Sequence, residues 1–214
     1  YEKNYWSKNF KVDGDKCVVI PHYIEQFGTR GDATLFSPRK YLLYLGRAGK
    51  NKRIDLIIEA FLKLDNPEYD LYATVRPEDL NRRLQRMVRN NQKIILLGNI
   101  SDREKEKVLA NTEALVLASD YEAFGGVLLE ASVHRKPILC SALEVCREVL
   151  DAEGAIFFDN DLSSLVYAMN TLFNTSNEDR TRMGNKNYLN LKKYSFENIR
   201  EKYRMLFKEL DVLK

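Results

Sequence analysis

Six short apolar runs recur along the chain, and each is followed by a segment whose apolar residues recur at helical spacing. Ile54, Ile57 and Phe61, for example, share one face of the segment at 52–64. Strands that are apolar throughout are buried on both faces, which is typical of a parallel sheet covered by helices. The alternation predicts an α/β fold: a Rossmann-like doubly wound parallel sheet of about six strands with C-terminal helices. The runs lie at 41–46, 69–75, 93–98, 113–119, 137–141 and 155–159.

Helical patterns fill the intervals between these runs and continue to the end of the chain. Two long patterns occupy 178–213, and apolar residues from Ile199 to Leu210 anchor the second of them. Their spacing predicts helices that pack by one apolar face. The other expected helices lie at 78–90, 102–111, 125–135, 144–150 and 162–174.

The start of the chain has a different texture. Residues 1–38 hold one strand candidate, at 16–21, followed by a stretch that contains Gly, Thr and Asp. We expect a sheet domain at 39–177 and a tail of helices at 178–214. Because the sequence does not begin with Met, we also expect a fragment of a longer protein.

The composition, with 44% hydrophobic and 30% charged residues, is that of an ordinary globular protein. The net charge of +3 and the dispersed basic residues give no reason to expect nucleic-acid binding. No apolar run approaches the roughly 18 residues that a membrane span needs, and the N-terminus lacks the apolar core of a signal peptide. Cys17, Cys140 and Cys146 have no metal-ligand spacing, so we expect reduced thiols and a cytoplasmic protein.

Ligands of doubly wound sheets bind beyond the carboxyl ends of the strands. Three stretches lie there: Gly46 to Lys52, Gly98 to Ser101, and Ser119 to Gly126. In the third, Gly125 and Gly126 open a helix whose free N–H groups and positive dipole end suit a phosphate. The alternative is a tight strand-to-helix turn that needs Gly for its geometry alone.

Two carboxylates flank this glycine pair. Glu130 lies about two turns into the expected helix, where a carboxylate can accept hydrogen bonds from both hydroxyls of a ribose. Alternatively, it forms an ion pair with Arg135 or Lys136, or caps another helix. Glu122 precedes the helix and can accept hydrogen bonds from sugar hydroxyls. Its alternative is a solvated loop glutamate that interacts favourably with the helix dipole.

Two cations, Arg47 and Lys52, lie on the loop that follows the first strand. Together they can neutralise a diphosphate and stabilise it as a leaving group. Alternatively, they are solvated charges beside a turn.

Other chemistry has little support in the sequence. Asp159 and Asp161 resemble a metal-binding pair, but they lie between an apolar run and a helix, where a cap is favoured. His22 and His134 have no partners for a nucleophilic triad. Neither G-x-G-x-x-G nor G-x-x-x-x-G-K-[ST] occurs, which disfavours dinucleotide-dependent redox chemistry and P-loop hydrolysis.

At these residues the sequence resembles a known family, the retaining "group 1" glycosyltransferases of the GT-B fold, in their C-terminal donor-binding half. Glu122 and Glu130 match the E-x7-E motif of this family, within EAFGGVLLEASVHRKPIL at 122–139. GRAGKNKRIDLIIEAF at 46–61 resembles its G-R-x-x-x-x-K-G-x-D-x-L-I-x-A-F segment. VIPHYI at 19–24 is similar to its interdomain linker.

The resemblance covers roughly residues 17–175 and includes three motifs in the right order. Arg53 and Arg135 stand where the family usually has Gly, and His22 and Tyr23 replace the Asn-Gly of its linker. The resemblance implies that residues 1–38 are the end of an N-terminal domain together with the interdomain linker.

The resemblance also implies a role for each loop. Arg47 and Lys52 would grip the donor diphosphate, Glu122 would hold the donor sugar, and Glu130 would hold the ribose. Backbone amides at the glycine pair would contact the sugar and the phosphate. The implied substrate-binding residues are Gly98, Asn99 and Ile100, which border the base, and Phe124, Gly125, Gly126 and Val127.

The implied reaction transfers a hexose from a nucleoside diphosphate sugar to a glycan or lipid-linked acceptor in polysaccharide biosynthesis. No metal or other cofactor is expected, because fixed cations serve instead. The acceptor would bind to a missing N-terminal domain, and the full-length enzyme would associate peripherally with the inner face of the membrane. The alternative is a non-catalytic nucleotide-sugar-binding or regulatory module. A sugar-nucleotide epimerase would need acid and base residues that the sequence does not place.

Overall fold

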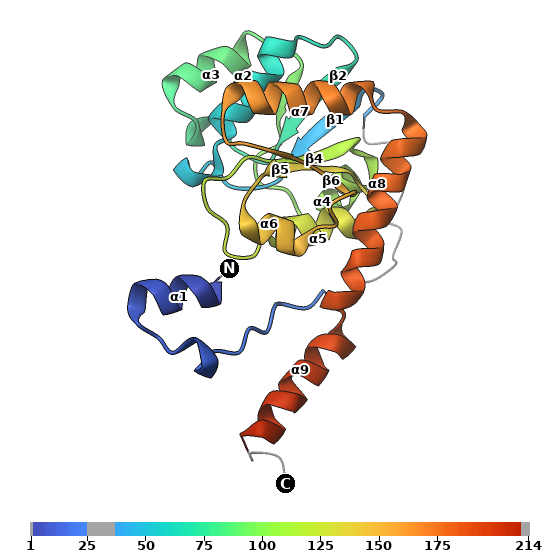
Figure 1. The fold of residues 1–214 in the computed structure, drawn as a ribbon. Helices are drawn as coiled ribbons and strands as arrows, with labels where there is room; N and C mark the ends of the chain where they lie inside the picture. Colours follow the sequence, from blue (N-terminus) through green and yellow to red (C-terminus); the bar gives the residue numbers. More distant parts are fainter. Residues whose placement is uncertain (1, 25–36, 211–214) are drawn as a thin grey trace.

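The computed structural model describes residues 2–24 and 37–210 and confirms the predicted α/β fold (Figure 1). Six strands form one parallel sheet in the order β3-β2-β1-β4-β5-β6. The order reverses between β1 and β4, so the crevice that such sheets use for ligands lies at the carboxyl ends of these two strands. The strands are β1 (Lys40–Tyr44), β2 (Tyr69–Ala73), β3 (Ile94–Leu96), β4 (Ala114–Leu117), β5 (Ile138–Ser141) and β6 (Ala155–Phe158).

Helices cover both faces of the sheet (Figure 1). Successive side chains of β1 alternate between two cores: Leu42 and Tyr44 pack into one, and Tyr41 and Leu43 into the other. The first core also holds α2 (Ile54–Leu64), α3 (Arg82–Arg89) and α7 (Leu162–Asn174). The second holds α4 (Asp102–Asn111), α5 (Gly126–Val133) and α6 (Glu144–Val149).

Side-chain caps fix where several of these helices begin. Asn81 accepts a hydrogen bond from the Leu84 amide, so α3 starts later than the predicted 78–90, after the short 3-10 turn η3 (Pro77–Asp79). The prediction that the acidic pair after β6 caps a helix is confirmed, because Asp161 accepts from the amide of Ser164 at 2.9 Å. Hydrogen bonds from Ser163 and Ser164 lower the pKa of the Asp161 carboxyl.

The predicted strand at 16–21 is wrong. The 3-10 turn η1 (Gly14–Lys16) is followed by irregular backbone, and Val18 and Val19 are exposed, with no strand in 37–210 paired to them. A helix that was not predicted, α1 (Glu2–Phe10), precedes this segment. The segment at 19–24, which resembles an interdomain linker, contacts the C-terminal tail at its last residue, since the Ile24 amide donates a hydrogen bond to the Tyr194 carbonyl at 3.0 Å.

The tail forms α8 (Asn177–Asn190), the 3-10 turn η4 (Leu191–Tyr194) and α9 (Phe196–Glu209). Figure 1 shows α8 running beside the sheet domain and α9 pointing away from it. The apolar anchoring predicted for the second tail helix holds only at Ile199, which is buried. Tyr203, Phe207 and Leu210 are exposed and Leu206 is partly exposed, so most of the apolar face of α9 is not buried by the described residues.

Candidate functional site

The three predicted loops lie at the carboxyl edge of the sheet and are joined to one another by hydrogen bonds. The Asp120 amide donates to the Asn51 carbonyl at 2.8 Å, which links the loop after β4 to the loop after β1. The Gly46 amide donates to Thr74 Oγ1 at 2.9 Å, and the Gly98 amide donates to the Val75 carbonyl at 3.2 Å. The loop after β2 therefore joins the loop at 46–52 to the loop at 98–101, and the three predicted loops form one rim.

Lys52 and Glu122, far apart in sequence, form an ion pair at the centre of this rim. Glu122 is only 7% exposed, so the predicted alternative of a solvated glutamate does not describe this residue. Ser119 Oγ also donates to Glu122 Oε1, at 2.8 Å. Both bonds fall on Oε1, and no described residue donates to Oε2. One oxygen of this buried carboxylate therefore remains available to a ligand.

Arg47 lies on the same rim but is exposed, and its guanidinium pairs with no residue in 2–24 or 37–210. The backbone of Arg47 is held by a hydrogen bond from the core, because Tyr44 Oη donates to the Arg47 carbonyl at 2.8 Å. Tyr44 is fully buried, and burial together with the charge of Glu122 raises the pKa of its phenol. The rim therefore offers Lys52, which is already paired, and Arg47, which is free to turn toward an anion.

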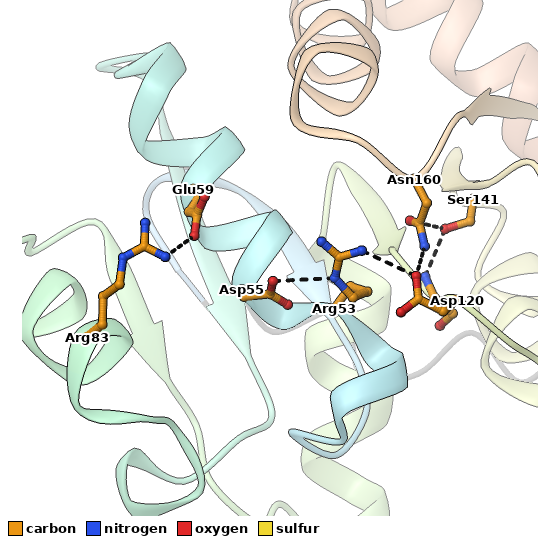
Figure 2. Close-up of polar contacts among 8 residues, drawn as sticks. Arg53, Asp55, Glu59, Arg83, Asp120, Ser141 and Asn160 are labelled. Carbon is orange, nitrogen blue, oxygen red and sulfur yellow. Dashed lines mark hydrogen bonds and ion pairs between the residues drawn. The ribbon is translucent and has the colours of Figure 1, made fainter.

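A second polar network supports the loop after β4 from the other side (Figure 2). Arg53 donates to Asp120 at 3.3 Å and contacts Asp55 at 3.4 Å, and these carboxylates raise the pKa of the guanidinium against the opposing effect of burial. Asn160 donates to the same Asp120 at 2.6 Å and accepts from Ser141 at 2.9 Å. Four segments of the carboxyl edge are thus tied together at Asp120.

Arg53 has φ of 42°, a left-handed conformation that is costly for a residue with a Cβ. This is one of the two positions where Arg replaces the usual Gly. The backbone path that Gly would allow is kept, and the guanidinium gains two carboxylate partners. A hollow of about 590 Å³ lies beside this network, where Arg83 is paired with Glu59 at 2.7 Å (Figure 2).

The glycine pair is the junction between the rim and α5. Gly125 has φ of 75°, and a Cβ there would lie 2.8 Å from Leu128 Cδ1, so the backbone needs Gly at this position. A Cβ on Gly126 would meet no atom within 4 Å. The alternative interpretation, in which the turn needs Gly only for its geometry, therefore explains Gly125 but not Gly126. At Gly126 the helix N-terminus faces open space.

Glu130 lies on α5 with its side chain 37% exposed, so it is less buried than its apolar neighbours in the sequence implied. Its partner is Lys105 of α4, whose Nζ lies 3.3 Å from Glu130 Oε1, and not Arg135 or Lys136. Burial alone would lower the pKa of Lys105, but Glu130 and Asp102 raise it. As with Glu122, no described residue donates to Oε2 of Glu130.

The loop at 98–101 lies beside this pair. Gly98 has φ of 65°, Asn99 is exposed, and Ile100 packs against the core under α4 and α5. Ser101 then caps α4 through a reciprocal bond with Glu104, which fixes where Lys105 lies on the helix. Phe124 contacts the rings of His22 and Tyr194 at 5.5 and 5.6 Å, beside a hollow of about 360 Å³.

Sequence reasoning placed Ser119 in a predicted loop without giving it a role, and it missed three other polar residues of this edge, Lys105, Ser141 and Asn160. Ser141 ends β5, and Ser119 and Asn160 each lie two residues after the end of β4 or β6, so a search for polar residues near strand ends would have found all three. Lys105 lies within α4 and not near a strand end, so the same search would not have found it. In the described part of the chain no three His, Cys, Asp or Glu residues are arranged to hold a metal ion. Its helices also include none with the length and apolar character of a membrane span.

Comparisons with known proteins point to one family. The sequence model described as "Glycosyl transferases group 1" matches residues 25–190. The N-acetylgalactosamine-N,N'-diacetylbacillosaminyl-diphospho-undecaprenol 4-alpha-N-acetylgalactosaminyltransferase of Campylobacter jejuni is 25% identical over 205 residues, which cover 90% of this chain and 53% of that protein. The O-antigen chain mannosyltransferase of Salmonella typhimurium is 27% identical over 159 residues, 72% of this chain and 43% of its own.

A solved glycosyltransferase structure from Rickettsia africae has the same fold. It superposes with a TM-score of 0.85 at 18% identity, covering 97% of this chain and 61% of its own. The chain spans about half the length of the curated relatives described above.

Proposed function

The chain belongs to the glycosyl transferases group 1 family, and on this premise we propose that it is the donor-binding domain of a retaining glycosyltransferase. The proposed enzyme transfers a hexose from a nucleoside diphosphate sugar to a glycan or lipid-linked acceptor. Within this proposal, residues 1–38 are the end of an N-terminal domain and the linker, 39–177 bind the donor, and 178–214 are C-terminal helices.

One observation carries the proposal: the carboxyl-edge rim combines cations, a free helix N-terminus and two carboxylates that each keep one oxygen open. A diphosphate needs a cation and a free helix N-terminus, and Lys52 and Gly126 supply them at neighbouring positions of the rim. Hydroxyl-rich groups such as sugars need the open carboxylate oxygens, because a carboxylate accepts hydrogen bonds from hydroxyls. A nucleoside diphosphate sugar is a ligand that carries a diphosphate between two such groups.

We assign the diphosphate to Arg47, Lys52 and the amides from Phe124 to Val127. When the bond between the sugar and the diphosphate breaks, the departing oxygen takes the electron pair and gains negative charge. Fixed cations and the α5 N-terminus stabilise that charge without reorganising, which lowers the barrier. The acceptor oxygen forms the new bond on the same face of the sugar, and its proton passes to the departing diphosphate oxygen. No metal is needed for this charge compensation.

We assign the two carboxylates to opposite ends of the donor. Glu122 lies beside the diphosphate cation Lys52, which suits a role in binding the sugar hydroxyls. Glu130 lies farther along α5, near the loop of Gly98, Asn99 and Ile100 that borders the base in this proposal, which suits a role in binding the ribose. The half-exposed position of Glu130 leaves room for a ribose to approach.

The acceptor is proposed to bind through a domain outside this chain. The name of the Campylobacter relative includes diphospho-undecaprenol, a lipid-linked group. We therefore propose a lipid-linked or glycan acceptor, and peripheral association of the full-length enzyme with the cytoplasmic face of a membrane.

A thermal-shift screen of the purified chain against UDP-, GDP- and ADP-sugars tests donor binding. A ligand at ten times its dissociation constant should stabilise the fold by about 1.4 kcal/mol, which raises the melting temperature by about 3–6 °C. Addition of EDTA should leave the shift unchanged. Arg47→Met should reduce the shift without lowering the melting temperature of the free protein, because Arg47 is exposed and pairs with no described residue.

The absence of a shift with every nucleotide and nucleotide sugar at millimolar concentration would contradict the proposal. A shift that requires Mg²⁺ would contradict the metal-free charge compensation. Transfer is tested on the longer protein that contains this chain. Donor binding by that protein without transfer to any lipid-linked or glycan acceptor would favour the non-catalytic binding module.

A further inference from the structure

A third hollow, of about 280 Å³ and lined mostly by polar residues, lies at the opposite edge of the sheet from the proposed donor site. Lys40 begins β1, Glu113 precedes β4, and Lys136 precedes β5, so these residues share the amino edge of the parallel strands. The first turn of α8 borders the hollow through Asn177 and Arg180. The donor loops, by contrast, all follow the carboxyl ends of strands, so the two sites are separate.

The charges around this hollow do not balance. Four cationic side chains line it, Lys40, Arg135, Lys136 and Arg180, against the single carboxylate of Glu113. That carboxylate is already used, because it pairs with Arg180, which is only 7% exposed. The carboxyl-edge hollow beside Arg53 differs in this respect, since Arg53 and Arg83 each have a carboxylate partner there.

Two of the four cations are occupied elsewhere. Lys40 lies 3.8 Å from Glu68, and Arg135 stacks on the ring of Tyr188 at 3.6 Å. Lys136 has no comparable partner, because its ammonium makes no ion pair or hydrogen bond with any described residue. Lys136 is half-buried; burial lowers its pKa, against the opposing effect of Glu113.

Arg180 adds a second unused donor. Its terminal nitrogens contact Glu113 and the carbonyls at the end of α7, but its buried Nε has no acceptor among the described residues. A buried donor without an acceptor, beside a half-buried cation without an anion, is unfavourable. An anion in the hollow would pair with the Lys136 ammonium and would lie beside the Arg180 guanidinium, which also lines the hollow.

We propose that the hollow lined by Lys136 and Arg180 at the amino edge of the sheet binds a phosphate group. Lys136 supplies the main charge, Arg180 a hydrogen bond, and the positive end of α8 a further favourable field. A volume of about 280 Å³ is below the roughly 300–1,000 Å³ of pockets for drug-sized ligands, so a single small group is expected. The phosphate group has two sources, free inorganic phosphate and the headgroup of an anionic lipid.

Thermal unfolding in sodium phosphate, compared with sodium chloride at equal ionic strength, tests the site. Phosphate at ten times its dissociation constant should raise the melting temperature of the wild-type chain by about 3–6 °C. Lys136→Met should lose this increment, yet melt no lower than wild type in chloride, because it removes an unpaired, half-buried charge. Lys136→Arg should retain the increment, and so should Lys63→Met, a matched control at an exposed lysine of α2.

Arg47→Met separates the two edges of the sheet, because it removes a proposed diphosphate contact at the carboxyl edge only. If Arg47→Met loses the increment and Lys136→Met keeps it, phosphate binds at the donor site and the inference is overturned. Flotation with phosphatidylglycerol vesicles, with phosphatidylcholine vesicles as the control, tests the lipid source. Binding to anionic vesicles that Lys136→Met abolishes would identify a lipid headgroup as the source. If neither phosphate nor vesicles give an effect that depends on Lys136, the site does not exist.

Discussion

Glu122 and Glu130 lie on either side of the same glycine pair, but their surroundings differ. Glu122 is 7% exposed, pairs with Lys52 and accepts a second bond from Ser119. The side chain of Glu130 is 37% exposed and has one partner, Lys105, at 3.3 Å. The first carboxylate is held in a buried network before any ligand arrives, whereas the second remains partly accessible to solvent.

The difference indicates what each end of the proposed donor site contributes. A buried and paired carboxylate is preorganised, so a sugar placed on its open oxygen is oriented without further loss of side-chain freedom. A half-exposed carboxylate held by one long contact adapts to its ligand. We infer that the Glu122 end sets the orientation of the transferred group and that the Glu130 end contributes mainly affinity for the nucleotide.

The largest expected difference in stability is between removing the lysine that pairs with Glu122 and removing the lysine that pairs with Glu130. Lys52→Met leaves Glu122 buried without its partner, which should lower the free energy of unfolding by about 3 kcal/mol. Lys105→Met should lower it by less than about 1 kcal/mol, because Glu130 remains hydrated. Urea denaturation of both variants measures the contrast. Adding Glu122→Gln to Lys52→Met should recover part of the loss, and equal losses for the two lysine variants would remove the distinction between the ends.

The glycine pair lies between the two carboxylates, and substitution by Ala should have different effects at its two positions. Gly125→Ala should lower the free energy of unfolding by about 1–2 kcal/mol, because its φ of 75° is strained for Ala and a Cβ would approach Leu128 closely. Gly126→Ala should leave stability unchanged but weaken nucleotide binding about tenfold, because the methyl group enters the space proposed for phosphate. Denaturation and calorimetry on both variants check this, and an unaltered affinity for Gly126→Ala would place the phosphate elsewhere.

Lys105 should act through Glu130 as a positioning residue. Lys105→Met should weaken binding of a nucleoside diphosphate about threefold to tenfold, because Glu130 loses the contact that orients it. The same substitution should not affect binding of the 2′,3′-dideoxy nucleotide, which lacks the hydroxyls assigned to Glu130. Calorimetry with both ligands distinguishes this from a general loss of structure, which would weaken both equally.

The smallest effect concerns pH at the far end of α5. Burial lowers the pKa of His134 below its ordinary 6.5, although Glu106 at 2.9 Å opposes this and Lys136 and Glu130 act nearby. The unfolded chain then binds the proton more readily than the folded one. Stability is therefore full above about pH 6.5 and decreases as the pH falls through the window just below it.

His134→Gln should flatten this slope by a few tenths of a kcal/mol, measured as urea stability at several pH values. His22→Gln, which changes the other histidine of the chain, serves as the control. A slope that is unchanged in His134→Gln would assign the pH dependence to other groups.

The sequence predicted the sheet well because parallel strands are buried on both faces and therefore read as apolar runs. It failed at 16–21 for the same physical reason. Val18 and Val19 form an apolar run, but a run becomes a strand only when a neighbouring strand accepts its hydrogen bonds, and none of the strands that the structure describes lies beside it.

The site was predicted less completely because ion pairs across the fold have no signature in local spacing. The sequence offered Arg135 and Lys136 as partners of Glu130 because they follow closely along the chain. The chain instead turns at Arg135, with φ of 54°, which places Lys136 at the amino edge of the sheet. Lys105, on another helix, became the partner of Glu130. Contacts of this kind become visible only in three dimensions.

Calorimetry on the two carboxylates tests the central claim most directly. Glu130→Gln should weaken binding of the free nucleoside diphosphate and of its sugar conjugate alike, by about tenfold to a hundredfold, because a hydrogen bond to a charged group is lost. Glu122→Gln should spare the free diphosphate and weaken only the conjugate, by a similar factor. Equal losses on both ligands for Glu122→Gln would contradict its assignment to the sugar. A Glu130→Gln protein that binds both ligands normally would return Glu130 to a structural ion pair with Lys105.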